Sequence, residues 1–306
     1  GELVIQSGSS PTTAVTFSGA NATFAGTING VGISYNISNF SESLLISNDA
    51  GTGTLSTATA NTGFGHEVFD DLTSGDNNTA VGHEAGDALT SGSLNTFVGS
   101  AAGGGNQSSS NNTAVGAFAF DAGTGADNVA IGSGALGGGS NSAADNVAIG
   151  FDAGNQISSG ASNVLIGSHA GDALNTGTGN VAVGHVALTN EDGNGYNVAI
   201  GFEALTALNA GADGYNVAVG TSAGASLVTG TNNTFVGTSA GQILGTSGSG
   251  GNHCTFLGYQ AGFDGDTIIQ TTAVGAKALH EITTGNYNVA VGFEALEETT
   301  VGDYNT

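Results

Sequence analysis

The sequence has almost no basic residues. Lys277 is the only lysine or arginine among 306 residues, whereas Asp and Glu total 25, which gives a formal net charge of −24. A protein that binds nucleic acid neutralises phosphates with several Lys or Arg side chains, and binding to an anionic membrane surface needs the same groups. The composition therefore excludes both of these functions.

Cysteine, proline and long apolar runs are equally scarce. Cys254 is the only cysteine, so no intrachain disulfide can form. Pro11 is the only proline, which excludes collagen in spite of the 55 glycines. No apolar stretch approaches the roughly 20 residues of a membrane span, so we expect no membrane insertion. Apolar residues still make up 39% of the chain, which is enough to build a core.

A five-residue motif recurs along most of the chain. It reads Asn, then Thr or Val, then a small or apolar residue, then an aliphatic residue or Phe, then Gly; we number these positions 1 to 5. Nine of the thirteen spacings between the closing glycines are 17 residues. A degenerate copy at Ser43–Ser47, followed by Ala50-Gly51, brings the number of copies to fifteen. This period is too short for helical-hairpin repeats or propeller blades and is typical of one turn of a β-solenoid.

The motif has the pattern of a strand that is apolar on both faces. Position 2 is Thr or Val in all fourteen regular copies, position 4 is Val, Ile, Leu or Phe, and position 3 is Ala in nine copies. Side chains alternate across a strand, so positions 2 and 4 share one face and position 3 lies on the other. One face lines the coil interior, and the other would need a second covering surface. We therefore expect oligomerisation.

Other positions of the repeat predict structural roles. Position 8, three residues after the closing glycine, is Ala in thirteen of fourteen copies and predicts a tight buried corner. Position 9 is either large and apolar or Gly, and several Gly copies carry Leu or Ile at position 12, so two coil variants are expected to fill the same interior. Stacked position-1 amides predict an asparagine ladder. Representative repeat residues are Asn78, Gly82, Ala85, Asn146, Gly150, Ala153, Asn197, Gly201, Ala204, Asn288, Gly292 and Ala295.

The repeats divide the chain into two parts. Residues 1–42 show strand-like alternation without the 17-residue period and predict a β-rich connector or cap, and residues 43–306 form the solenoid shaft. At the other end Asn305 and Thr306 begin a further copy, so we expect the natural chain to continue or to be processed there. The predicted fold class is all-β, a parallel β-solenoid, or β-roll, of about fifteen 17-residue coils.

Chemistry-bearing residues are few. His66-Glu67 and His83-Glu84 occupy equal positions in successive coils, a geometry that could bind a metal ion. Zinc requires three or four ligands, however, and Ser100-Ala101 ends the row in the next coil, so the sequence alone predicts no metal site. Glu67, Glu84 and Glu203 are the best candidates for paired glycosidase carboxylates. The chain has no Trp and one base, so a solvated acidic face is the alternative, and we expect no enzyme activity and no cofactor.

An exposed stripe of aromatic and acidic residues is a further candidate. Phe151, Phe202, Tyr259 and Phe293 all follow a closing glycine and accompany the acidic row. Such a stripe could contact glycans or pack at a subunit boundary.

The repeats resemble two families of fibrous proteins. Asn146–Gly150 and Asn197–Leu205 resemble the head repeats of trimeric autotransporter adhesins, which are left-handed parallel β-rolls assembled as trimers. The longer unit, with Thr284-Gly285 and Asn78–Gly82 as examples, looks more like the shaft repeats of phage tail fibres, and Val15–Ile28 is similar to segments that precede such shafts. The period of 17 exceeds the coil of the autotransporter heads, which places that family second.

The resemblance implies a structural and non-enzymatic function. We expect a homotrimeric segment of a viral tail fibre or spike that displays or forms a host-receptor-binding surface, located on the virion tail. Its expected partners are other virion tail proteins and a host surface glycan or protein receptor. The alternatives are a bacterial trimeric surface adhesin or self-assembling extracellular filament at the cell surface, and a glycan-cleaving tailspike.

Overall fold

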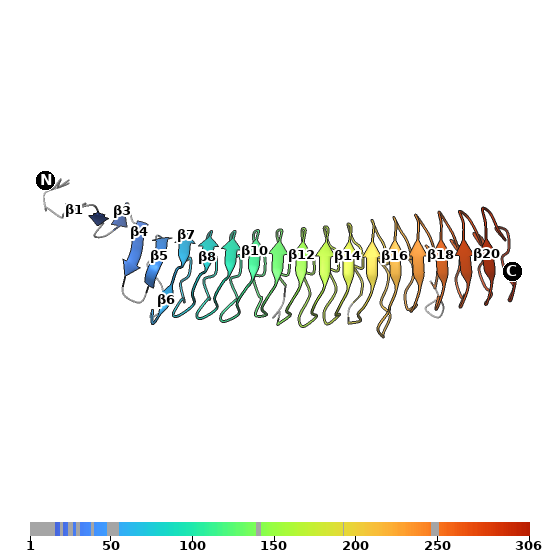
Figure 1. Cartoon of the computed structure of the whole chain (residues 1–306), viewed down its shortest axis with the longest axis horizontal. Helices are drawn as coiled ribbons and strands as arrows, with labels where there is room; N and C mark the ends of the chain where they lie inside the picture. The colour runs from blue at the N-terminus through green and yellow to red at the C-terminus, as the bar shows by residue number, and fades with distance from the viewer. Residues whose placement is uncertain are drawn as a thin grey trace.

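Each 17-residue repeat forms one coil of a rod, and the coils stack along the rod axis (Figure 1). The computed structural model describes residues 55–138, 142–191, 193–245 and 251–306, together with the backbone of the strands between residues 16 and 47 and the side chains of residues 43–46. Within this part of the chain every regular element is a β-strand. None of it forms a helix long and apolar enough to cross a membrane.

The strands become regular from β7 onward, where each is three residues long and begins 16 to 21 residues after the one before. They are β1 (Thr16–Ser18), β2 (Asn21–Thr23), β3 (Thr27–Ile28), β4 (Val31–Ile37), β5 (Phe40–Ser47), β6 (Ala58–Thr59), β7 (Thr62–Phe64), β8 (Thr79–Val81), β9 (Thr96–Val98), β10 (Thr113–Val115), β11 (Val129–Ile131), β12 (Val147–Ile149), β13 (Val164–Ile166), β14 (Val181–Val183), β15 (Val198–Ile200), β16 (Val217–Val219), β17 (Thr234–Val236), β18 (Thr255–Leu257), β19 (Thr272–Val274) and β20 (Val289–Val291).

One parallel ladder joins β5, β7 and all later strands without a register shift. β5 pairs with β7, and every later strand pairs with the next one along the chain up to β20. Equal motif positions face each other, as in Val181↔Val198 between β14 and β15. The longer spacing of 21 residues from Gly237 to Gly258 leaves the register unchanged, as the pair Val236↔Leu257 shows. The parallel β-solenoid predicted from the repeat is therefore confirmed.

The strands that lead into this ladder pair antiparallel. β3 pairs with β4, and β4 pairs with β5 in a hairpin that has a register irregularity between Tyr35 and Ile37. The predicted boundary at residue 42 lies inside β5, so this strand belongs both to the hairpin and to the parallel stack. Residues 1–15 of the expected connector, and Ala50-Gly51 of the degenerate copy, lie outside the described residues.

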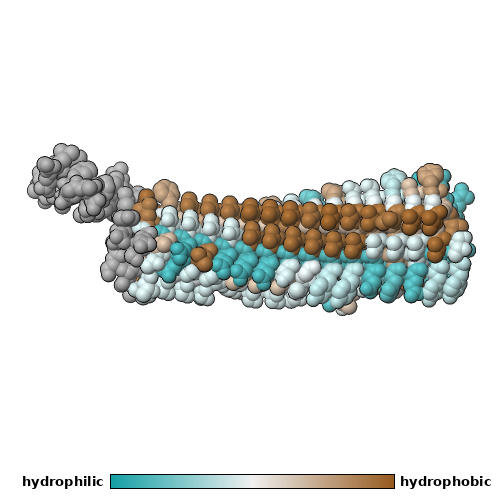
Figure 2. Space-filling model, viewed as in Figure 1, coloured by the Kyte–Doolittle hydropathy of each residue, from teal (hydrophilic) through white to brown (hydrophobic). Residues whose placement is uncertain are grey.

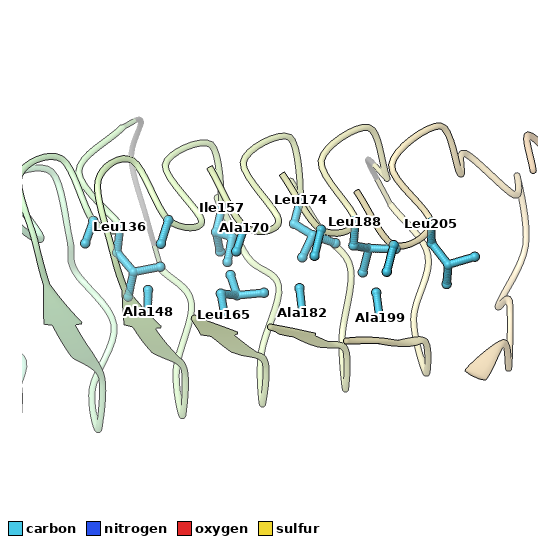
Figure 3. Close-up of a cluster of buried hydrophobic side chains, with 14 of the residues drawn as sticks. Leu136, Ala148, Ile157, Leu165, Ala170, Leu174, Ala182, Leu188, Ala199 and Leu205 are labelled. Carbon is cyan, nitrogen blue, oxygen red and sulfur yellow. The ribbon is translucent and has the colours of Figure 1, made fainter. Parts of the chain in front are cut away.

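Position 3 points into the coil. Ala182, the middle residue of β14, is fully buried, whereas its neighbours Val181 and Val183 are partly exposed. Position 8 is buried as well, and in the close-up of Figure 3 the strand residues Ala148, Leu165, Ala182 and Ala199 meet leucines and isoleucines from the opposite turns. The interior is therefore one apolar column that runs along the rod.

Size complementarity across this column explains the two coil variants. Position 9 has a left-handed φ in both, 49° at Leu136 and 58° at Gly154. It is Gly wherever position 3 is large in the same coil or in the next one: a Cβ atom on Gly171 would lie 2.7 Å from Leu165, and one on Gly154 would lie 2.6 Å from the same side chain. Coils whose own position 3 and next position 3 are small carry Leu or Phe at position 9. The large position-3 residues are Phe97, Leu165, Phe235 and Phe256.

The asparagines of position 1 form a ladder of hydrogen bonds. The backbone N–H of Asn163 donates to Asn146 Oδ1 at 3.0 Å, and its Nδ2 donates to the same oxygen at 3.0 Å and to the carbonyl of Gly177 at 2.9 Å. Asn180 N–H donates in turn to Asn163 Oδ1 at 2.9 Å. These amides are buried, so each satisfies groups that water cannot reach. Together with the in-register ladder they set one constant distance from coil to coil.

Candidate functional site

The outer face of the sheet carries no charged side chain in the coils from β7 to β20 and is apolar over most of its length. Positions 2 and 4 of each strand point away from the interior, as in β12, where Val147 and Ile149 lie on either side of the buried Ala148. Figure 2 shows them as two parallel rows of side chains on the surface. We call these two rows the outer apolar face.

The two rows differ in composition. The position-4 row is apolar in every coil and consists of Phe64, Val81, Val98, Val115, Ile131, Ile149, Ile166, Val183, Ile200, Val219, Val236, Leu257, Val274 and Val291. The position-2 row is Val from Val129 to Val217 and at Val289, and Thr elsewhere, which Figure 2 shows as a brown stretch between paler ends. In the position-4 row, Ile131, Ile166 and Ile200 are each 37% exposed.

This face is large for an exposed apolar surface. Thirteen strand spacings of about 4.8 Å give a length of about 60 Å, and two rows about 7 Å apart give a width of about 10 Å, hence about 600 Å². That is the upper end of the range for the largest patch on a monomeric protein. No Asp, Glu, Lys or His occupies positions 2 or 4 of these coils, so the charge of −24 is carried by other surfaces.

The aromatic and acidic stripe runs beside this face, at positions 6 and 7. Phe151 and Phe202 are about half exposed, and each contacts a histidine: His169 meets Phe151 edge-on at 5.3 Å, and His185 stacks on Phe202 at 5.6 Å. Tyr259 and Phe293 are also exposed. The predicted stripe is thus a row of exposed aromatic edges interrupted by other residues.

The candidate carboxylates are not brought to one place. Glu67 and Glu84 lie in neighbouring coils, but Glu203 lies seven coils beyond Glu84, about 34 Å along the stack. Glycosidase carboxylates act at separations of roughly 5–10 Å. Glu203 therefore cannot form a pair with either of the other two within one chain.

Carboxylates concentrate near the start of the stack. Asp87 and Asp121 approach each other across Gly104, whose added Cβ would lie 2.7 Å from Asp121 Oδ1 and 3.3 Å from Asp87 Oδ1. Partial burial raises the pKa of both carboxyls, and the charge of Glu84 raises them further. The ion pairs of Lys277 are far away, with Glu297 at 3.2 Å and Glu294 at 4.0 Å, and the hydrogen bond to Glu297 raises the pKa of Lys277.

The representative repeat residues take part in the framework that holds the outer apolar face. Asn78, Asn146, Asn197 and Asn288 are buried in the ladder, Ala85, Ala153 and Ala204 fill corners, and Gly82, Gly150 and Gly201 end the strands. Ala295, in the last coil, is only partly buried.

Sequence reasoning missed one buried acid. Glu191 occupies position 12, where neighbouring coils have Leu174 and Leu208, and its Oε1 accepts hydrogen bonds from the backbone and side-chain amides of Asn194 at 3.1 and 2.8 Å. The large Leu188 at position 9 of the same coil, fully buried, supplies the apolar volume that Glu191 does not. The signal was in the sequence, as a charged residue at a position where most coils have Leu or Ile.

Comparison with known proteins gives no match to this chain, whether with protein-family models, with curated proteins or with solved structures.

Proposed function

We propose that this chain is a structural, non-enzymatic fibre segment that assembles as a homotrimer through its outer apolar face. The observation that carries the proposal is the continuous, uncharged face of positions 2 and 4 on a rod. Burial of these water-exposed Val and Ile side chains would stabilise an assembly by about 25 cal/mol per Å² of apolar surface removed from water.

A further copy of the same chain is the occupant that suits this face best. The rows repeat with the constant coil spacing of the ladder, so an aligned copy presents the same spacing over the whole length. Three faces of about 600 Å² that meet in a trimer would remove about 1,800 Å² of surface from water in total. Two strongly acidic chains can approach there because the face itself carries no charge, and three chains with −24 each would keep the assembled rod soluble.

The family resemblance completes the proposal. A trimeric rod suits a tail fibre or spike of a virus, which holds or forms a host-receptor-binding surface; a bacterial surface adhesin of the same architecture is the alternative. The exposed aromatic stripe beside the face is the surface that would contact a glycan. Binding of the purified fibre to a glycan array tests that part, and Phe151→Ala together with Phe202→Ala is expected to weaken any binding found.

The oligomeric state tests the assembly. Sedimentation equilibrium is expected to give three times the chain mass of 29.5 kDa for the unaltered protein. The double variant Ile149→Glu, Ile166→Glu should be monomeric with an unchanged circular dichroism spectrum, because both side chains are on the outer face. Gln156→Glu with Asn190→Glu adds the same charge at exposed positions elsewhere and should stay trimeric. A stable monomer of the unaltered chain would overturn the proposal.

A further inference from the structure

Two histidine–glutamate pairs lie in neighbouring coils at the start of the stack, at positions 6 and 7. His66-Glu67 follow the strand β7 and His83-Glu84 follow β8, and these strands pair in register. The two imidazole rings are nearly parallel, with their centroids 5.1 Å apart and an interplanar angle of 13°. Equal positions in successive coils thus lie side by side.

Backbone conformation turns each carboxylate towards the histidine that precedes it. Glu67 and Glu84 have left-handed φ angles of 52° and 55°. As a result Glu67 Oε2 lies 3.3 Å from His66 Nδ1, and Glu84 Oε2 lies 3.5 Å from His83 Nδ1. One nitrogen or oxygen atom from each of His66, Glu67 and His83 lies within 4.8 Å of the other two.

The nitrogen His66 Nδ1 gives an independent indication of a ligand. It is shielded from water and has no hydrogen-bond partner of acceptable geometry among the described residues. A shielded imidazole nitrogen without such a partner loses the hydrogen bond that it would make to water, which costs free energy. A metal ion bound beside His66 would accept the lone pair of His66 Nδ1.

The surroundings favour a cation. Asp87 and Asp121 lie in the same part of the stack and interact with the charge of Glu84. The single lysine of the chain, Lys277, is in the coil of β19, eleven coils beyond that of β8. The local potential is therefore negative, and a bound divalent ion would offset part of the repulsion between carboxylates.

We propose that His66, Glu67 and His83 bind one divalent transition-metal ion, with zinc as the best match. Imidazole nitrogen and carboxylate oxygen are both ligands of zinc, at about 2.0–2.2 Å, which places the ligand atoms about 3.4 Å apart in a tetrahedron. Partly exposed side chains can close from 4.8 Å to that separation by rotation about their χ angles. Calcium and magnesium, which prefer sites made of oxygen atoms alone, suit the two imidazoles less well.

His185 and His280 lack this arrangement, and His169, whose Nδ1 is also shielded without a hydrogen-bond partner, belongs to no such group of ligands among the described residues. His185 occupies the same position 6, but it stacks on Phe202 and is followed by Val186. His280 stacks on Phe263 at 5.1 Å. These two residues therefore serve as matched controls. An ion coordinated by residues of two successive coils would cross-link these coils near the start of the solenoid.

Titration calorimetry of the full chain with zinc chloride alone tests the proposal. We expect one ion per chain for the unaltered protein, a loss of at least roughly tenfold in affinity for His83→Ala, and a similar loss for Glu67→Gln. His185→Ala and His280→Ala should bind as the unaltered chain does. All variants should keep the same circular dichroism spectrum, since these side chains are on the surface. The visible absorption of bound Co²⁺ should indicate tetrahedral coordination.

Two results would overturn the proposal. One is the absence of zinc binding by the unaltered chain at concentrations up to about 100 μM, which corresponds to a free energy of binding weaker than about 5.5 kcal/mol. The other is zinc binding of unchanged affinity and stoichiometry in His66→Ala and His83→Ala. Neither result depends on the oligomeric state, so the proposed assembly and the metal site can fail separately.

Discussion

A Cβ atom on Gly220 would lie 2.6 Å from the carbonyl carbon and oxygen of Gly237, the equivalent glycine of the next coil. The φ of Gly220 is 138°, a conformation that residues with a side chain rarely adopt. The same close approach recurs in the coils along the stack. In the last coil the φ of Gly292 is 134°, but the atom nearest to its added Cβ is 3.9 Å away. A side chain at Gly220 would thus both strain the backbone and collide with the next coil, whereas a side chain at Gly292 would only strain the backbone.

Replacing these glycines should measure the two effects. Gly292→Ala is expected to cost about 1–3 kcal/mol through backbone strain alone, and Gly220→Ala should cost more because the methyl group also meets the next backbone. Urea denaturation gives the free energies, and hydrogen exchange of the flanking amides shows whether the loss is local. An equal loss at the two positions would contradict the role of the neighbouring carbonyl.

The interior column can be tested with a double-mutant cycle. Ala182→Leu places a large position-3 residue opposite Leu188 and should cost about 1–3 kcal/mol by overpacking. Leu188→Gly empties the same space and should cost at least about 2 kcal/mol. The double variant reproduces the pairing of Leu165 with Gly171, and Gly171 of the preceding coil already leaves room for it. We expect a favourable coupling of roughly 1–3 kcal/mol in thermal or urea unfolding. Additive losses would show that the two positions do not share a volume.

Removing one amide from the ladder should destabilise two coils. Asn163→Ala takes away the acceptor of Asn180 N–H and the donor to the carbonyl of Gly177. Each buried group left without a partner costs about 1–3 kcal/mol, so we expect a loss of at least about 2 kcal/mol. Asn209→Ala, at an exposed position, is the control and should change stability by less than about 0.5 kcal/mol. Urea unfolding measures both, and equal stabilities would argue against the ladder as a stabilising element.

Cys254, which replaces Asn at position 1 of its coil, should make stability depend on alkaline pH. Burial raises the pKa of its thiol from 9.0 to about 11, so the folded chain keeps the proton over a range in which the unfolded chain loses it. The associated stability is fully present below about pH 9 and is lost as the pH rises towards 11, by about 2–3 kcal/mol. Cys254→Ala should not show this component, and the difference between the two unfolding curves isolates it.

The same burial predicts slow modification of the thiol. In the folded chain at pH 8 the reaction of Cys254 with iodoacetamide should be far slower than in urea, and it should accelerate about tenfold per pH unit up to about pH 11. A rate at pH 8 that matches the rate in urea would mean that the thiol is accessible and ionises normally.

The sequence predicted the fold because its periodicity is itself structural. The repeat combines a 17-residue spacing, a β-branched residue at position 2 and an asparagine at position 1. Together these features predict that equal positions lie one above another, and in-register pairs such as Val164↔Val181 confirm it. Position 8 could be predicted as a buried corner, since Ala recurs there and is small. The outer apolar face was implied by the two-faced pattern, although the pattern did not say which face is outside.

The candidate metal ligands mark the limit of such reasoning. The sequence placed His66 above His83. It could not predict where the carboxylates of Glu67 and Glu84 point, because the left-handed φ of these two residues cannot be recognised from the residue type. The sequence also showed that position 9 is Gly in some coils and Leu or Phe in the others. The cause of the glycines, a large side chain at position 3 in the same or the next coil, is a contact between residues that only the closed coil brings together.

By itself, then, the sequence determined the repeat, the strand, the parallel stacking and the absence of basic surfaces, because these follow from composition and period. The tertiary structure decided the rest: position 3 lies inside because the chain closes into a coil around it, and positions 2 and 4 are left outside as two apolar rows. It also decided that successive glycines approach too closely for a side chain and that ligand atoms of His66, Glu67 and His83 lie within 4.8 Å of one another. These are distances between coils, and they arise only when the chain has folded back on itself.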